Sequence, residues 1–170
     1  LNLHTGTHLD FPLHMIKHGK TSTNFDIKRL IRTVKVLDLS HLEEKVTDQD
    51  LMTYDLFEND FLLIKTRNSF ENEFNPSFIY FDQTASEYIK NLGCQGVGID
   101  ALGIERQQES YPTHHTFFNH DMLIIEGLRL KDVKEGQYLM IALPLSIDNV
   151  EALPLRVVLL DTYEDLKSLF

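Results

Sequence analysis

Short apolar runs, separated by turn-forming residues, dominate the pattern of this chain. Residues 33–39 alternate between apolar and polar side chains, and residues 61–66 are almost all apolar. The first pattern is typical of a half-buried β-strand and the second of a strand buried on both faces. Three similar runs complete the set of predicted strands: residues 96–100, 138–143 and 155–160. We therefore expect a core built on a β-sheet.

Helical signals are fewer than strand signals. Asp82 is suited to cap a helix over residues 83–92, whose apolar side chains share one face, and Gly93 is suited to end it. Shorter helices are expected after Thr47 and over residues 114–121, and residues 67–78 read as a long polar loop. A mixed sheet with few helices predicts an α/β fold. No repeat or linker divides the chain, so we expect one domain over residues 1–170.

Composition limits the classes of partner. The 170 residues carry a net charge of −10, which argues against binding nucleic acid or an anionic membrane surface. No apolar run approaches the ~20 residues that a membrane-spanning helix needs. Cys94 is the only cysteine, so no intrachain disulfide can form, and it reads as a small buried residue. These features fit a reducing compartment, and we expect a cytoplasmic protein.

The segment HTGTHLDFPLH, residues 4–14, carries the clearest chemistry. Its four residues of metal-ligand type all have even numbers: His4, His8, Asp10 and His14. Gly6 and Pro12 make a helix unfavourable, and in an extended chain the four side chains would project to one side. Gly6 also permits a bend that brings His4 back toward Asp10. Imidazole nitrogen and carboxylate oxygen are ligands of borderline divalent metals. The alternative, a solvated polar strand, is disfavoured by four such residues in register.

A single segment rarely completes a metal site, so distant ligands should exist. Glu126 ends the apolar run 122–125, where a carboxylate is costly to bury unless it is paired or metal-bound. Its alternative is an ion pair with Arg129 or Lys131. Three histidines precede it: His114, His115 and His120. The first two are adjacent and point in different directions, and His120 reads as a surface residue.

Two further polar residues follow predicted strands. Asp100 ends residues 96–100 and Thr66 ends residues 61–66. Ends of strands often supply site residues in α/β folds, but an Asp there also forms local turns, and a Thr may simply end its strand. Both readings stay open, and neither residue is included in the candidate site.

The segment 4–14 resembles the HxGTHxDxPxH signature of the metal-dependent cyclase family, which includes bacterial kynurenine formamidases and isatin hydrolases. The resemblance continues in order along nearly the whole chain, through residues 15–21, 63–66, 96–100, 114–128, 142–145 and 154–156. It implies a swivelling β/β/α architecture and a homo-oligomer, either a dimer or a tetramer. Family members usually carry residues before this motif, so we expect that an N-terminal part is missing here.

The resemblance also completes the site. A histidine about a dozen residues before the glutamate is a family ligand, which points to His114, with His115 the next choice. The resemblance assigns proton transfer to His14, the last histidine of the motif. The expected metal ligands are His4, His8, Asp10, His114 and Glu126. They would hold one or two divalent ions, with zinc expected first and manganese as the alternative. If two ions bind, Asp10 is the natural bridge between them because its carboxylate has two oxygens.

We therefore expect a metal-dependent amide hydrolase that cleaves a small formamide or cyclic amide, with N-formylkynurenine as the first candidate substrate. No Ser-based or Cys-based triad is suggested. The alternatives are a cyclase or dehydratase on the same scaffold, and a non-catalytic metal-binding or ligand-binding protein. Residues 67–69 depart from relatives, which often have Gly and an aromatic there, and the chain has no Trp. The aromatic residues that would line a pocket instead are Phe11, Phe70, Phe74 or Phe117.

Overall fold

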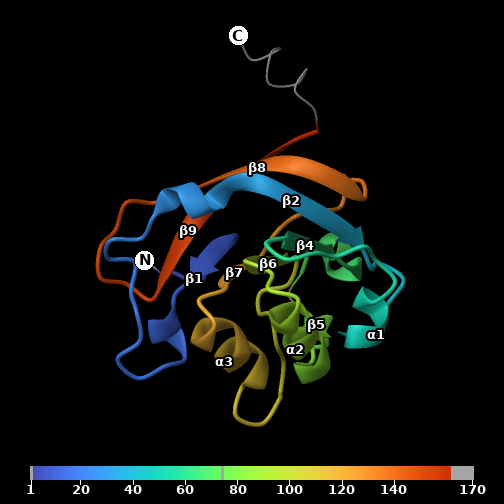
Figure 1. Ribbon diagram of the computed structural model, residues 1–170, viewed down its shortest axis with the longest axis horizontal. Helices are drawn as coiled ribbons and strands as arrows, with labels where there is room; N and C mark the ends of the chain where they lie inside the picture. Colours follow the sequence, from blue (N-terminus) through green and yellow to red (C-terminus); the bar gives the residue numbers. More distant parts are fainter. Residues whose placement is uncertain (1, 74, 162–170) are drawn as a thin grey trace.

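Seven strands close into a barrel in a computed structural model that describes residues 2–73 and 75–161 (Figure 1). Around the barrel the order is β1-β7-β6-β4-β2-β8-β9. The strands are β1 (His8–Asp10), β2 (Ile31–Asp38), β4 (Phe61–Lys65), β6 (Gly96–Ile99), β7 (Leu123–Glu126), β8 (Gly136–Pro144) and β9 (Ala152–Leu160). Strands β2, β4, β6 and β7 run parallel to one another, whereas β1, β8 and β9 are antiparallel to their neighbours. The predicted mixed sheet with few helices is confirmed.

The helices gather on one side of the sheet, away from the arched strands β2, β8 and β9 (Figure 1). They are α1 (Asp48–Leu51), α2 (Gln83–Asn91) and α3 (Pro112–Asn119). The 3-10 turns are η1 (Pro12–His14), η2 (Ile27–Leu30) and η3 (Arg67–Phe70), and of these η2 leads directly into β2 and contacts β8. The predicted cap of α2 is confirmed, because Asp82 accepts a hydrogen bond from the Ala85 backbone. Helix α3 begins earlier than predicted, at a proline, which is favourable in the first turn of a helix.

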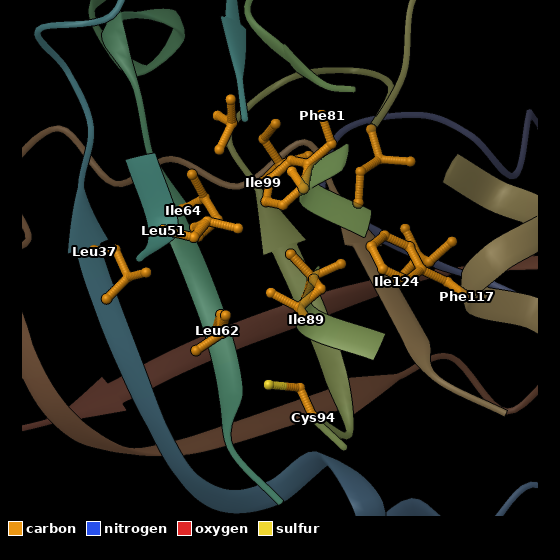
Figure 2. Close-up of a cluster of buried hydrophobic side chains, with 14 of the residues drawn as sticks. Leu37, Leu51, Leu62, Ile64, Phe81, Ile89, Cys94, Ile99, Phe117 and Ile124 are labelled. Atoms are coloured by element: carbon orange, nitrogen blue, oxygen red, sulfur yellow. The ribbon is translucent and has the colours of Figure 1, made fainter. Parts of the chain in front are cut away.

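The parallel strands β4, β6 and β7 are buried on both faces, whereas β2 is partly exposed. Leu62 and Ile64 of β4 face a core between the sheet and the helices, which also contains Cys94 (Figure 2). The alternate residues Phe61 and Leu63 face a second core inside the barrel. This double burial explains why β4, β6 and β7 appear in the sequence as continuous apolar runs.

Three expectations from the sequence need correction. Residues 4–14 do not form one extended strand: only His8–Asp10 is a strand, and η1 follows it. The segment 67–78 is not simply a loop, because it opens with η3. The small sheet of β3 (Lys45–Val46) and β5 (Tyr80–Phe81) was not predicted, since two-residue strands leave no periodic signal.

The parallel strands position the chemistry at one edge of the sheet. Glu126 is the last residue of β7, and Asp100 and Thr66 directly follow β6 and β4. In parallel sheets this carboxyl edge is where sites usually form. Within the described ranges, no helix is long and apolar enough to cross a membrane.

Candidate metal centre

Strand β1 provides the centre of the site. It lies antiparallel between β7 and β9, with His8 opposite Glu126 and Asp10 opposite Ile124. Because side chains alternate along a strand, His8 and Asp10 share a face, and Leu9 between them packs in the barrel core. His8 is 0% exposed and Asp10 is 1% exposed. Strand pairing therefore holds an imidazole and a carboxylate together in a buried place.

His4 reaches this centre through a bend. Gly6 has φ +66°, a left-handed conformation that glycine adopts readily. The bend places His4 Nδ1 3.2 Å from Asp10 Oδ1 and 3.2 Å from His8 Nε2. The sequence correctly indicated that Gly6 could return His4 to Asp10.

His14 also reaches the cluster, but by a turn. The 3-10 turn η1 folds the chain back after Asp10, and the His14 ring lies with its centroid 4.2 Å from that of His4 and 5.7 Å from that of His114. The expectation that His14 follows one strand repeat further on the same face is therefore wrong. Proline in the first turn of η1 explains the departure, because it favours a helical turn there.

The two remote residues meet the motif from opposite sides. His114, on α3, has its Nε2 3.5 Å from Glu126 Oε1, and Glu126 Oε2 lies 3.3 Å from His8 Nε2. Glu126 thus stands between two imidazoles. The alternative ion pair with Arg129 is not formed, since Arg129 donates to the Glu71 carbonyl.

The other candidate residues lie elsewhere. His115 is partly buried and joins no group of ligand atoms among the described residues. His120 is exposed, with its ring Nδ1 2.8 Å from the Thr116 carbonyl. Asp100 is buried and accepts hydrogen bonds from the Thr66 backbone and hydroxyl and from the Ser69 backbone. Its local role, stabilising the start of η3, accounts for its burial.

Two carboxylates were missed by the sequence analysis. Glu105 is 6% exposed, and its Oε1 lies 3.1 Å from Nδ1 of His114. Glu151 Oε1 lies 3.6 Å from Nε2 of His4. Both stand in polar stretches without periodic pattern, so nothing local marks them. Only the fold brings them to the histidines.

The ligand atoms form overlapping groups that suit more than one cation. One ligand atom each from His4, His8 and Asp10 lie within 4.8 Å of one another, as do atoms from Asp10, His14 and His114. A third group joins His4, His14 and Glu151, and Asp10 belongs to the first two groups. Among the described residues, both Asp10 oxygens and both His114 ring nitrogens are buried without a hydrogen-bond partner. Buried polar atoms left in this way are costly unless something binds them, and the donor set fits a divalent metal.

The electrostatics of the cluster follow from its carboxylates. Burial alone lowers the pKa of His114, but Glu105 and Glu126 outweigh burial and raise it to about 9. Burial opposes ionisation of Glu126, yet His114 and His8 lower its pKa to about 2. His14 differs, because burial dominates and lowers its pKa. His14 is thus neutral at neutral pH and can accept a proton.

A cavity of about 490 Å³ borders Asp10. Phe11 and Phe25 contribute aromatic rings to its lining, and Lys20, Arg29 and Asp121 contribute charges. Of the other proposed aromatic residues, Phe117 packs in the core, and Phe70 is exposed beside Lys65. Phe74 lies outside the described residues.

The closed mixed barrel and its imidazole–carboxylate cluster define a protein of the metal-dependent hydrolase class. The Cyclase family matches residues 1–106, which include the whole HTGTHLDFPLH segment. The chain belongs to this family, as its motif indicated.

The relatives agree with this assignment. A kynurenine formamidase of Geobacillus thermodenitrificans is 33% identical over 162 residues, which cover 94% of this chain and 77% of the relative. The solved structure of a potential metal-dependent hydrolase with cyclase activity is 47% identical, with a TM-score of 0.93 over 95% of this chain and 81% of that one. An isatin hydrolase bound to thioisatinate is 22% identical, with a TM-score of 0.80 over 95% and 74% of the two chains, and it supports the fold alone.

Proposed function

We propose that this chain is a metal-dependent amide hydrolase of the kynurenine formamidase type. The observation that carries the proposal is the group of partly buried His4 with buried His8 and Asp10, which meets His114 and Glu126 from distant parts of the chain. Relatives named as kynurenine formamidases support the same reaction class.

Five residues would hold the metal: His4, His8, Asp10, His114 and Glu126. Asp10 lies in two of the three groups of ligand atoms and has two oxygens free of hydrogen bonds among the described residues, so it would be suited to contact more than one ion. Zinc is our first choice and manganese the alternative, because both accept imidazole and carboxylate ligands. A bound divalent ion supplies hydroxide near neutral pH and polarises the substrate carbonyl.

His14 would move the protons of the reaction. Its ring lies beside that of His4 at a tilt of 38°, and its lowered pKa keeps it neutral at neutral pH. In this state it accepts a proton as water adds to the amide carbon. It then returns that proton to the leaving nitrogen as the C–N bond breaks. The products are a carboxylic acid and an amine, which balances the hydrolysis.

The candidate substrates follow from the relatives. Phe11 and Phe25 border the cavity beside Asp10 and meet edge to face with centroids 5.3 Å apart, but Phe11 is 3% exposed and packs in the barrel core. N-formylkynurenine, an aryl formamide, is the first candidate because relatives are named kynurenine formamidases. A ring amide such as isatin is the second.

The test is an assay of metal-loaded protein with N-formylkynurenine, other formanilides, isatin and simple lactams. We expect release of formate or a ring-opened acid, loss of turnover on chelation, and recovery when zinc or manganese is restored. Turnover of a non-amide substrate, with every amide left intact, would instead support the cyclase or dehydratase alternative. Light scattering on the same sample tests the expected dimer or tetramer.

A further inference from the structure

We propose that Glu105 is a positioning residue, which selects the tautomer of His114 that can bind metal. The inference rests on the proposed metal site, because it assigns His114 the role of ligand. Among the described residues, the contacts of Glu105 are with His114, Gln108 and Thr113, and none is with Asp10 or His8. It would therefore act on the metal through the imidazole.

The two ring nitrogens of His114 face two different carboxylates. Nδ1 lies 3.1 Å from Glu105 Oε1, and Nε2 lies 3.5 Å from Glu126 Oε1. A neutral imidazole carries one proton, and the nitrogen that binds metal must be the other one. The carboxylate oxygen of Glu105 beside Nδ1 favours the proton on that nitrogen, which would leave the Nε2 lone pair directed toward Glu126 and the metal cluster.

Glu105 is itself held in place by the helix that carries His114. Its Oε2 accepts hydrogen bonds from the Thr113 backbone at 2.7 Å and from Gln108 Nε2 at 3.1 Å. The same Gln108 nitrogen also donates to the Thr113 hydroxyl. Thr113 directly precedes His114, so the carboxylate and the imidazole share one support. Oε2 is occupied by donors, and Oε1 remains for His114.

The residue before Glu105 supports the other remote ligand. The backbone N–H of Ile104 donates to Glu126 Oε1 at 2.6 Å. Two consecutive residues thus orient both remote ligands, Ile104 through its backbone and Glu105 through its side chain. We infer that this loop is part of the metal-binding architecture.

His8 is held in the same manner by a different group. Its Nδ1 lies 2.9 Å from the Gly6 carbonyl oxygen, and its Nε2 faces Asp10 and Glu126. Both buried imidazoles therefore present Nε2 to the cluster and place Nδ1 beside an acceptor. For His8 the acceptor is backbone, which no substitution removes, but for His114 it is a side chain that can be changed.

The substitution Glu105→Gln makes a sharp test because it preserves size. The two donors at Oε2 require an oxygen in that position, so the new amide NH₂ would face Nδ1 of His114 and donate to it. The proton would then move to Nε2, the nitrogen that should bind metal. Turning the amide the other way would place NH₂ against the Thr113 N–H, which is also unfavourable.

The experiment measures affinity for zinc and manganese by competition with a chromophoric chelator. We expect Glu105→Gln to bind metal about 10- to 100-fold more weakly than the parent, the usual range for such outer partners. Glu109→Gln, an exposed position in the same loop, is the matched control and should bind as the parent does. Gln108→Ala is a milder variant that keeps the Glu105 carboxylate, and it should also weaken metal binding. It replaces Glu105→Gln as the test if that variant does not fold.

A second readout follows the tautomer directly. NMR of protein with ¹⁵N-labelled histidine should show the His114 proton on Nδ1 in the metal-loaded parent, and this signal should be lost in Glu105→Gln. Parent-like affinity with the Nδ1 proton retained would overturn the inference. So would an equal loss of affinity when Glu105→Gln is added to His114→Ala, because Glu105 would then not act through His114.

If the proposed metal site itself were wrong, the binding measurements would give a different result. In that case the parent would bind no metal, or His114→Ala would bind as tightly as the parent, whatever stands at position 105.

Discussion

Gly127 lies so close to Gly6 that a Cβ atom on Gly127 would stand 2.2 Å from the Gly6 carbonyl oxygen. The contact joins the bend that carries His4 to the turn that follows Glu126. A hydrogen bond from the Thr7 hydroxyl to the Gly127 carbonyl, at 2.8 Å, supports it. Because the same Gly6 carbonyl faces the His8 ring, this approach of two backbones aligns three of the proposed ligands.

Replacing Gly127 with alanine should therefore damage both the fold and the site. Gly127 and Gly6 both have positive φ, +69° and +66°, so either alanine variant carries a backbone cost of about 1–2 kcal/mol. Only at Gly127 does the new methyl group also collide, since nothing lies within 4 Å of a Cβ at Gly6. Urea unfolding should give a larger loss of stability for Gly127→Ala than for Gly6→Ala, with weaker zinc binding. Equal losses would contradict this account.

His14→Ala separates proton transfer from metal binding. We expect kcat to fall by roughly 10²- to 10⁴-fold, the range for a general acid–base group, while metal content stays near that of the parent. The distinction matters because a His14 nitrogen lies within 4.8 Å of ligand atoms of Asp10 and His114. His4→Ala is the comparison, and it should lose metal. If His14→Ala loses metal in proportion to activity, His14 is a ligand.

Asp100 should matter for stability and not for metal. Its carboxylate accepts hydrogen bonds from Thr66 and Ser69, and Asp100→Ala would leave these buried donors unpaired. We expect a loss of about 3 kcal/mol in the free energy of unfolding, since each orphaned donor costs about 1–3 kcal/mol. Metal affinity of the folded fraction should equal that of the parent. A selective loss of metal with unchanged stability would place Asp100 in the site.

Cys94, which is not among the proposed metal ligands, leads to a prediction about how stability depends on pH. Burial raises the pKa of its thiol from 9.0 to about 11. In the unfolded chain the thiol ionises first, so the stability gained from keeping it neutral is present below pH 9 and lost as the pH rises toward 11. The loss should be about 3 kcal/mol. Unfolding of the parent and of Cys94→Ala should diverge across this window, and parallel pH profiles would contradict the prediction.

The strands of the barrel could largely be predicted because burial on both faces leaves continuous apolar runs. Residues 61–66 and 96–100 lie within one residue of β4 and β6. The helix after Asp82 was equally clear, since its cap and its terminal glycine are both local signals. Closure of the barrel could not be predicted, because strand order depends on pairing between residues far apart in the chain.

The residues of the candidate site likewise differ in whether local sequence or only long-range contacts reveal them. The motif placed four ligand-type residues within one short segment, and the structure brings all four together, although by a bend at Gly6 and a turn at Pro12 instead of one strand. Glu126 could be proposed from its place after an apolar run, and His114 from the family resemblance. Glu105 could not, because its importance arises only when the loop before α3 meets the helix that carries His114.

Strand β1 has a consequence for how the protein is made. It pairs with β7 and with β9, so the first residues of the chain find their partners only in its last third. During synthesis, the HTGTHLDFPLH segment leaves the ribosome long before Glu126 and β9 exist. The proposed ligand set therefore cannot be complete on a growing chain until Glu126 has been translated. A chain released before that residue would carry the motif without its full pair of remote ligands.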